Sequence, residues 1–267
     1  MNNNPIGIFD SGIGGLTVVK EIIRQLPNES IIYLGDTARV PYGTRSNEVI
    51  TDFALQMIQF LIKKKVKFLV IACNTISAVS YDAIKNLSPV PILGVITPAV
   101  IQASRVSKNG KIGVIGTVGT IRSNTYGKLI KIINPKAEVL SIACPLFVPL
   151  AEEGLADDQV GKLVAKEYLK DLKKAQVDTL ILGCTHYPIL YKVIQREMGN
   201  RVNLVDSSHP TAEMLEKRLK NLKLLGNNAH PKWEFYVTDA PERVYQVAGR
   251  FFGEKLNGRL KKISLED

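Results

Sequence analysis

Short runs of Val, Ile and Leu alternate along this 267-residue chain with longer segments of helical periodicity. The apolar runs are nearly continuous, as in strands that helices cover on both faces. Residues 49–64, between two runs, repeat apolar side chains every three or four positions, which is the pattern of an amphipathic helix. This alternation predicts an α/β fold with mostly parallel sheets. The predicted strands are residues 6–9, 31–34, 68–72, 92–96, 112–115, 139–143, 179–182 and 202–205.

The apolar runs also pair off at a nearly constant distance along the chain. Gly7-Ile8-Phe9 resembles Gly113-Val114-Ile115 at an offset of 106 residues, and Cys73-Asn74-Thr75 resembles Cys184-Thr185-His186 at an offset of 111. An offset that drifts so little indicates a duplicated α/β unit, although any two α/β halves share generic apolar strands. Duplication would place two similar domains face to face, and the cleft between them is then the default binding site.

Composition excludes several classes of protein. Hydrophobic residues make up 45% of the chain and charged residues 22%, which is not the composition of a disordered chain. No apolar run reaches the roughly 18 residues of a membrane span. The start of the chain lacks the basic and apolar segments of a secretory signal, so we expect a cytoplasmic protein. The cysteines, Cys73, Cys144 and Cys184, are too few and too scattered for a disulfide framework or a zinc cluster.

Glycine-rich and polar clusters follow the predicted strands, at the edge where open parallel sheets bind ligands. Residues 10–15 read Asp-Ser-Gly-Ile-Gly-Gly, which departs from the dinucleotide-binding spacing, and the leading acid would repel a pyrophosphate. Backbone N–H groups at the start of the next helix suit a small carboxylate better. Residues 35–37 with 41–43, and residues 113–120, form further turn-rich loops.

Two cysteines stand at equivalent strand ends. Cys73 and Cys184 each follow an apolar run and precede residues suited to capping a helix. A thiol at a helix N-terminus can have its pKa lowered from about 8.5, which makes thiolate available near neutral pH. A single such cysteine is more often a small buried hydrophobe. Two at matching places would stand on opposite sides of one cleft, whereas Cys144 has no partner because Asp36 occupies the matching position.

Two facing thiols suit the inversion of a carbon stereocentre by proton transfer. One sulfur, as thiolate, removes the proton from one face while the other, as thiol, delivers a proton to the opposite face. Asp10, Glu152 and His186 lie at strand ends where they would hold or accept these protons. Each also has an ordinary structural interpretation, respectively as a helix cap, a solvated surface acid and a histidine in a cap region.

Taken in order, these motifs resemble those of the glutamate racemases, within the cofactor-independent, two-cysteine amino-acid racemase superfamily. The resemblance covers about residues 6–210, and the chain beyond it, with helical patterns at 213–225 and 243–255, carries no recognised motif. The matching segments are residues 9–17, 34–37, 41–43, 72–75, 143–154, 182–188 and 205–208.

This resemblance implies that Cys73 and Cys184 are the catalytic acid/bases, acting on opposite faces of the α-carbon of glutamate. Asp10 would assist Cys73, while Glu152 and His186 would assist Cys184. The residues implied to bind the carboxylates and amino group of the substrate are Asp10, Ser11, Tyr42, Gly43, Asn74, Thr75, Thr117, Thr185 and His186.

The resemblance also implies two flavodoxin-like domains with the active site in the cleft between them. The first would comprise residues 1–97 and 208–267, and the second residues 98–207. Neither pyridoxal phosphate nor a metal would take part, the product D-glutamate would supply peptidoglycan, and a homodimer is one expected state. Because a thiolate alone is a weak base for this carbon acid, we expect the domains to close over the substrate and exclude water.

Two alternatives remain open. Aspartate racemase and related enzymes share the architecture, and a pocket discriminates one methylene by only about 10–200-fold. The formal net charge of +10 would also suit a nucleic-acid-binding protein. However, the basic runs at 63–65, 173–174, 217–223 and 259–262 are scattered and no recognition motif accompanies them, which disfavours nucleic acid as a partner.

Overall fold

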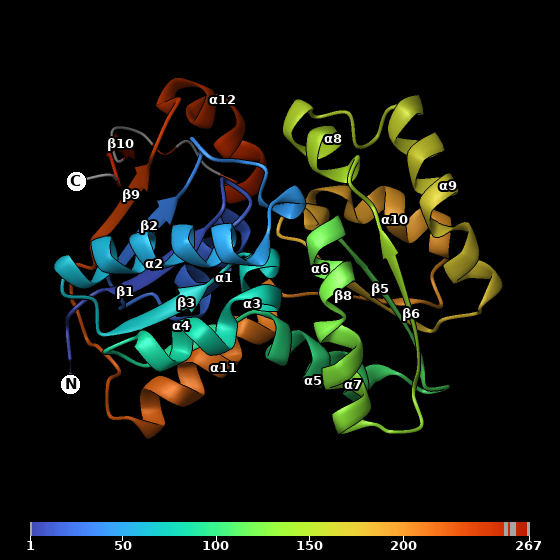
Figure 1. Cartoon of the computed structure of the whole chain (residues 1–267), viewed down its shortest axis with the longest axis horizontal. Coiled ribbons are helices and arrows are strands. Elements are labelled where there is room, and N and C mark those ends of the chain that lie inside the picture. Colours follow the sequence, from blue (N-terminus) through green and yellow to red (C-terminus); the bar gives the residue numbers. More distant parts are fainter. Residues whose placement is uncertain (1, 254–255, 257–259, 266–267) are drawn as a thin grey trace.

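Two lobes, each built on a sheet of parallel strands, lie side by side in the computed structural model of the chain (Figure 1). The structure describes residues 2–253, 256 and 260–265. The predicted α/β fold with two parallel sheets is confirmed. The strands are β1 Ile6–Asp10, β2 Ile31–Gly35, β3 Phe68–Ile71, β4 Ile92–Gly94, β5 Lys111–Gly116, β6 Glu138–Ala143, β7 Thr179–Gly183, β8 Asn203–Asp206, β9 Trp233–Val237 and β10 Leu260–Lys262.

Helices flank both sheets and supply the connections between successive strands (Figure 1). The α-helices are α1 Leu16–Gln25, α2 Asn47–Lys63, α3 Asn74–Val79, α4 Tyr81–Leu87, α5 Ile96–Val106, α6 Val118–Ser123, α7 Thr125–Ile133, α8 Phe147–Glu153, α9 Gln159–Lys174, α10 Tyr191–Met198, α11 Ser208–Asn221 and α12 Pro241–Phe252. Two short 3₁₀ turns are η1 Tyr42–Thr44 and η2 Tyr187–Leu190.

The same strand order recurs in both lobes. The larger sheet has the order β10-β9-β2-β1-β3-β4, and the smaller has β6-β5-β7-β8. Strands β1 to β4 and β5 to β8 therefore follow one pattern, in which the second strand lies outside the first and the third and fourth follow on the other side. The match supports the predicted duplication, and it places the loops after β3 and β7 at equivalent sites.

Burial explains why the strands read as continuous apolar runs. Strands β1, β2 and β7 are buried at every position, because helices cover both faces of each sheet. Helix α2 instead buries one stripe, including Ile50, Met57 and Leu61, and the hydroxyl of Ser46 caps its first turn by accepting from the N–H of Val49. One buried apolar cluster continues from the first lobe into the second, so the lobes share part of their core.

The tail of the chain completes the first lobe. Strand β9 pairs with β2, and β10 pairs with β9, which extends the larger sheet by two strands that the apolar pattern did not predict. The helices predicted at 213–225 and 243–255 correspond to α11 and α12, although residues 254–255 lie outside the described part. The predicted strand at 92–96 ends early, because Ile96 already begins α5.

The predicted domain boundaries at residues 97 and 208 stay predictions. Helix α5 spans the first of them and packs against β7 and β8 of the second lobe. Helix α11 begins at the second boundary and packs against α1 of the first lobe.

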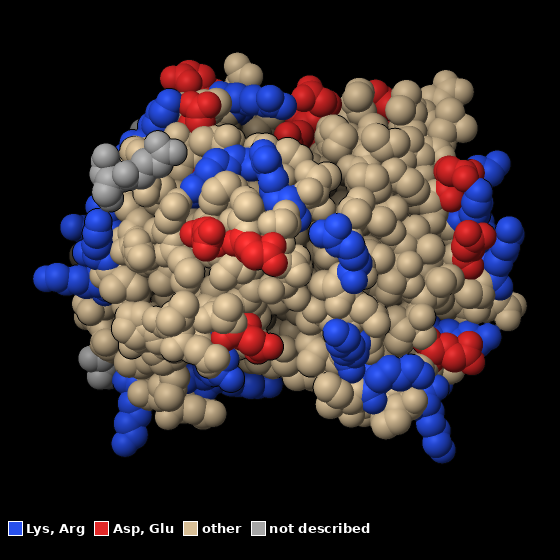
Figure 2. All heavy atoms as spheres, in the orientation of Figure 1, with Lys and Arg blue, Asp and Glu red and all other residues tan. Residues whose placement is uncertain are grey.

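Two surface properties bear on possible partners. None of the helices in the described ranges combines the length and the apolar character needed to cross a membrane. Figure 2 shows Lys and Arg side chains dispersed over one face of the molecule, with Asp and Glu side chains among them. The dispersal on this face matches the scattering of the basic runs along the sequence.

Candidate active site between the lobes

Cys73 and Cys184 occupy equivalent positions beyond β3 and β7, and both are buried, with 4% and 6% of their surfaces exposed. Cys73 is the cap of α3, where its sulfur accepts from the N–H of Ile76 at 3.5 Å. The third cysteine, Cys144, is fully buried next to β6, and its burial raises the pKa of its thiol.

The sulfur of Cys73 contacts Ser11 and is influenced by the buried carboxyl group of Asp10. The thiol of Cys73 donates to Oγ of Ser11 at 3.4 Å. Asp10, at the end of β1, accepts through Oδ2 from the N–H groups of Gly15 at 2.9 Å and Gly12 at 3.3 Å. Its Oδ1 is buried and has no hydrogen-bond partner among the described residues.

Burial decides the protonation state on this side of the site. It raises the pKa of the Asp10 carboxyl, against the charge of His186 and the hydrogen bonds from backbone N–H groups, which lower it. Burial also raises the pKa of the Cys73 thiol to about 12, and the negative charge of Asp10 adds to the rise. At neutral pH the resting form of Cys73 is therefore the thiol, a proton donor.

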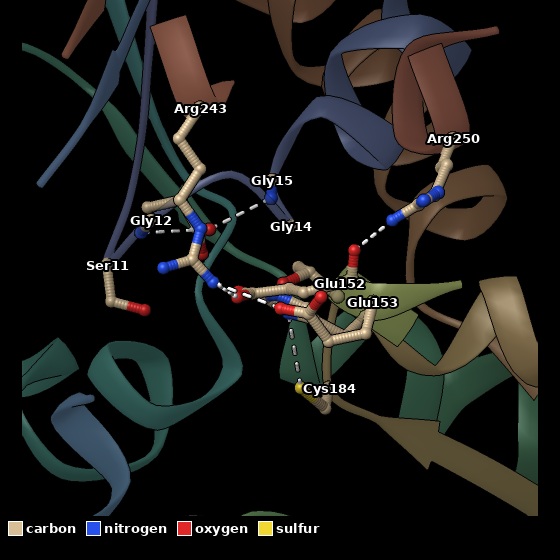
Figure 3. A network of polar contacts seen from close by, with 12 residues as sticks. Ser11, Gly12, Gly14, Gly15, Glu152, Glu153, Cys184, Arg243 and Arg250 are labelled. Atoms are coloured by element: carbon tan, nitrogen blue, oxygen red, sulfur yellow. Dashed lines mark hydrogen bonds and ion pairs between the residues drawn. The ribbon is translucent and has the colours of Figure 1, made fainter. Parts of the chain in front are cut away.

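The sulfur of Cys184 lies beside a histidine–carboxylate pair (Figure 3). Nδ1 of His186 is 3.9 Å from this sulfur, and Nε2 of the same ring is 3.0 Å from Oε1 of Glu152 on α8. Burial opposes the charged imidazole, but the hydrogen bonds and charges of Cys184 and Glu152 outweigh it and raise the pKa of His186 to about 10. A hydrogen bond from His186 in turn lowers the pKa of Glu152. At neutral pH an imidazolium therefore faces Cys184.

Polar side chains of the two lobes meet directly around these strand ends. Tyr126 on α7 donates its hydroxyl to Oδ1 of Asn74 at 2.6 Å, which fixes the residue directly after Cys73. The hydroxyls of Thr75 and Thr117 are 2.9 Å apart, and Thr120 lies 3.3 Å from the hydroxyl of Thr75. The structure thus brings together predicted substrate-binding residues from both lobes.

Glycines allow the lobes to approach this closely. A Cβ at Gly14 would lie 2.3 Å from Oγ1 of Thr185 and 2.4 Å from Nδ1 of His186. A Cβ at Gly43 would lie 2.9 Å from Cβ of Thr117. Because the backbones of one lobe touch side chains of the other here, any side chain at position 14 would separate the lobes.

Tyr42 has a different setting from the one expected of a substrate-binding hydroxyl. Its hydroxyl donates to Oδ2 of the buried Asp36, which also accepts from Nε of Arg39 at 2.6 Å and, through Oδ1, from Thr238 at 2.8 Å. This network ties the side chain of Tyr42 into the first lobe. The part of this loop that faces the second lobe is the main chain of η1 at Gly43, which lies against Thr117 and Gly119.

Residues 6–215 match the family model described as Asp/Glu/hydantoin racemase. The chain belongs to this racemase family. The glutamate racemase of Geobacter metallireducens is 50% identical over 262 residues, covering 98% of this chain and 97% of that protein. The glutamate racemase of Syntrophus aciditrophicus is 45% identical, covering 97% of this chain and 98% of that protein.

Solved structures agree with this family membership. The glutamate racemase RacE1 of Bacillus anthracis superposes with a TM-score of 0.95 at 42% identity, and covers 99% of each chain. The glutamate racemase of Francisella tularensis, solved in complex with D-glutamate, has a TM-score of 0.93 at 43% identity, with 100% of this chain and 99% of that chain covered. The aspartate racemase of Picrophilus torridus is 17% identical with a TM-score of 0.58, which shows a shared fold alone.

In this racemase the motif-based prediction missed the contacts that support the site from outside the motifs. Tyr126 holds the predicted site residue Asn74, yet the sequence offers only an isolated polar residue at position 126. Asp36, which binds the hydroxyl of Tyr42, lies in the matching segment 34–37, but the sequence does not show this contact. Arg243 and Arg250 on α12 contact the segment that carries Glu152. Their seven-residue spacing, which puts both on one face of a helix, was the available signal.

Proposed function

We propose that this protein interconverts L-glutamate and D-glutamate by proton transfer at the α-carbon, with Cys73 and Cys184 as the two acid/bases. The observation that carries the proposal is the pair of buried cysteines at equivalent strand ends, each with its own proton-handling partner. Glutamate is the proposed substrate because the full-length relatives at 43% identity or more bear the name glutamate racemase, and one was solved with D-glutamate.

In the proposed reaction the carbon–hydrogen bond breaks on one face of the substrate and re-forms on the other. One sulfur, as thiolate, takes the α-hydrogen as a proton, and the electron pair of the broken bond spreads into the adjacent carboxylate. The thiol on the opposite face then delivers its proton to the α-carbon. The two sulfurs end with their protonation states exchanged, and no external oxidant, reductant or cofactor is needed for this balance.

The unequal surroundings of the sulfurs favour one starting state. Cys73 is held as a thiol by burial and by the charge of Asp10. The imidazolium of His186 interacts favourably with negative charge on the sulfur 3.9 Å away. The resting protein is thus poised for Cys184 to remove a proton and for Cys73 to donate one.

The remaining site residues are proposed to hold the substrate and reset the sulfurs. Ser11, Gly43, Asn74, Thr75, Thr117 and Thr185 would bind its carboxylates and amino group, together with the main chain at Tyr42. After a turnover that starts at Cys184, the Cys73 thiolate would regain its proton through the carboxyl group of Asp10, whose Oδ1 has no hydrogen-bond partner among the described residues. The Cys184 thiol would release its proton to water, because the imidazolium of His186, which is paired with Glu152, stabilises the thiolate that remains.

The proposed cellular role is the supply of D-glutamate for peptidoglycan in the cytoplasm. Its test is growth of a bacterial strain that requires added D-glutamate, after the chain is expressed in that strain. Growth without the supplement supports the role, whereas continued dependence by a strain that contains active protein contradicts it. The homodimer stays a prediction.

The proposed activity is tested with purified protein, L-glutamate and no added cofactor, by following optical rotation. We expect rotation to decay to zero with glutamate, and to decay far more slowly with L-aspartate. Cys73→Ala and Cys184→Ala should each abolish racemisation, while Cys144→Ala, the matched control at a buried thiol, should keep most of it. Faster racemisation of aspartate than of glutamate would show that aspartate is the substrate. Full activity of Cys73→Ala or of Cys184→Ala would refute the assignment of that sulfur as an acid/base.

A further inference from the structure

Helix α12 lies in the part of the chain that carries no racemase motif, yet it reaches the proposed active site. The helix packs against α1 and β10, so it belongs structurally to the first lobe. Two of its arginines, Arg243 and Arg250, extend to α8 of the second lobe (Figure 3). Because α8 carries Glu152, these contacts join the first lobe to the proton-handling pair beside Cys184.

The two arginines hold the end of α8 at different atoms. Nη2 of Arg243 is 3.7 Å from Oε2 of Glu152 and 3.3 Å from Oε1 of Glu153. Nη1 of Arg250 donates to the main-chain oxygen of Glu152. A guanidinium at this place also interacts favourably with the C-terminal dipole of α8.

Glu152 is consequently held from both sides. Its Oε1 faces Nε2 of His186 at 3.0 Å, while its Oε2 faces Arg243. Gly154 ends α8 with φ +76°, and a Cβ there would lie 2.9 Å from Cζ of Arg250, so the guanidinium lies directly against the helix end. Phe251, also on α12, packs its ring edge-on against the ring of His186 at 5.1 Å between centroids.

We propose that Arg243 and Arg250 are positioning residues, which fix Glu152 against His186 and so hold the imidazolium of His186 beside Cys184 only while α12 lies on α8. The inference rests on the proposed function, since it concerns one half of that reaction. It also gives the unassigned tail a role: a first-lobe helix aligns second-lobe chemistry when the lobes are together.

Loss of this support slows proton transfer at Cys184 and leaves transfer at Cys73 intact. The equilibrium constant of a racemisation is one, so kcat/KM must fall equally in both directions. The α-deuterium isotope effects on kcat/KM separate the two halves. When the Cys184 step slows, the effect rises for the enantiomer whose α-hydrogen Cys184 removes, and it falls for the other enantiomer.

The experiment compares Arg243→Gln with Glu152→Gln, using L- and D-glutamate deuterated at the α-carbon. Arg243→Gln should lower kcat/KM about 10-fold, since small displacements of catalytic groups cost up to about 100-fold. The isotope effects of Arg243→Gln for L-glutamate and D-glutamate should differ from each other, and the enantiomer with the larger effect should be the same one as for Glu152→Gln. Arg243→Lys, which keeps the charge, should restore most of the activity.

Arg24→Gln is the matched control, and it should not change the isotope effects. The two arginines are alike in exposure, 63% for the side chain of Arg24 and 64% for that of Arg243, and each pairs with a glutamate, but Arg24 pairs with Glu21.

A double variant tests whether the arginine acts through the carboxylate. Adding Arg243→Gln to Glu152→Gln should slow the enzyme by less than about 2-fold further, because residues that act as a unit are not additive. Fully additive losses, or equal isotope effects despite a slower reaction, would show a merely structural role and overturn the inference. Failure of the wild-type protein to racemise glutamate would instead refute the proposed function itself.

Discussion

Cys73 and Cys184 are equivalent by position but not by chemical environment. A buried carboxylate stands near one sulfur, and a charged histidine paired with a carboxylate stands next to the other. A racemase acts on two mirror-image substrates with a chiral protein, so its two acid/bases need not share one set of neighbours. This asymmetry makes the pH dependence informative about the Cys184 side.

The fall of kcat/KM at alkaline pH is predicted to follow the deprotonation of His186. The pKa of His186 is raised to about 10 by Cys184 and Glu152 despite burial, so the imidazolium persists through neutral pH and is lost as the pH rises through about 10. We expect kcat/KM to be level up to about pH 9 and to fall above it, because this parameter reports the free enzyme. Glu152→Gln removes one of the charges that raise this pKa and should move the fall to lower pH. A fall near pH 6.5 in the wild type would contradict the assignment.

Site residues that lie in motifs could be identified from the sequence, whereas contacts between residues far apart in the chain could not. Strand-end position marked Cys73, Cys184 and Asp10, because parallel strands gather their carboxyl ends at one edge. Tyr42 lies in a motif, yet only the structure shows that its hydroxyl bonds to Asp36 within the lobe. Arg243 meets Glu152 only because α12 returns to the first lobe after the second is complete.

At the scale of elements, helix packing depends on polar contacts as well as apolar stripes. Glu21 on α1 accepts from Nη2 of Arg24 at 2.7 Å and lies 2.8 Å from Nδ1 of His209 on α11. The hydrogen bond from Arg24, then that from His209, lowers the pKa of Glu21 to about 2, against partial burial. This carboxylate thus joins α1 to α11, the helix that carries the chain back into the first lobe.

Glu21→Gln is predicted to lower the free energy of unfolding at neutral pH and to make this free energy depend less on pH in acid. Because the folded-state pKa is depressed, the contribution is complete above the unfolded pKa near 4.5 and is lost as the pH falls through about 2. Solvent screening limits it to about 0.5–1 kcal/mol. Urea unfolding at pH 7 and pH 3 measures the difference, with Glu213→Gln as a control on the other side of His209. If the free energy of unfolding fell equally between pH 7 and pH 3 in the wild type and in Glu21→Gln, the prediction would be contradicted.

The eight strands β1 to β8 were predictable from their apolar runs, and the two strands that the tail adds to the larger sheet were not. The runs at β1 to β8 carry enough apolar residues to stand out from their neighbours. Strand β10 has three residues, two of them exposed lysines, which is typical of a sheet edge and resembles a loop in sequence. Strand β9 buries only its second half, so its pattern is weak without knowledge of the partner strand β2.

At the scale of the whole molecule, the lobes are together in this structure. Hydrogen bonds such as those from Tyr126 to Asn74 and from Thr17 to the main-chain oxygen of Thr185 cross between them. Both sulfurs are buried, so a substrate reaches them only if the lobes separate. Opening and closure would also release and restore the contact of α12 with α8.

The lobes are predicted to open without substrate and to close over glutamate. Small-angle scattering of the free protein should indicate a larger radius of gyration than the present structure has, and saturating D-glutamate should bring it to the value of the present structure. Closure is expected because water must be excluded while charge develops on the substrate. Identical scattering with and without D-glutamate would contradict this prediction.

The most direct test of the two-base mechanism is the fate of the α-hydrogen during the first few per cent of conversion of L-glutamate in D₂O. NMR of the separated enantiomers measures deuterium at the α-carbon in each. With two bases on opposite faces, the D-glutamate formed should be fully deuterated while the remaining L-glutamate keeps its protium. Protium retained in the product, or deuterium appearing equally in both enantiomers from the start, would mean that one base serves both faces and would contradict the account.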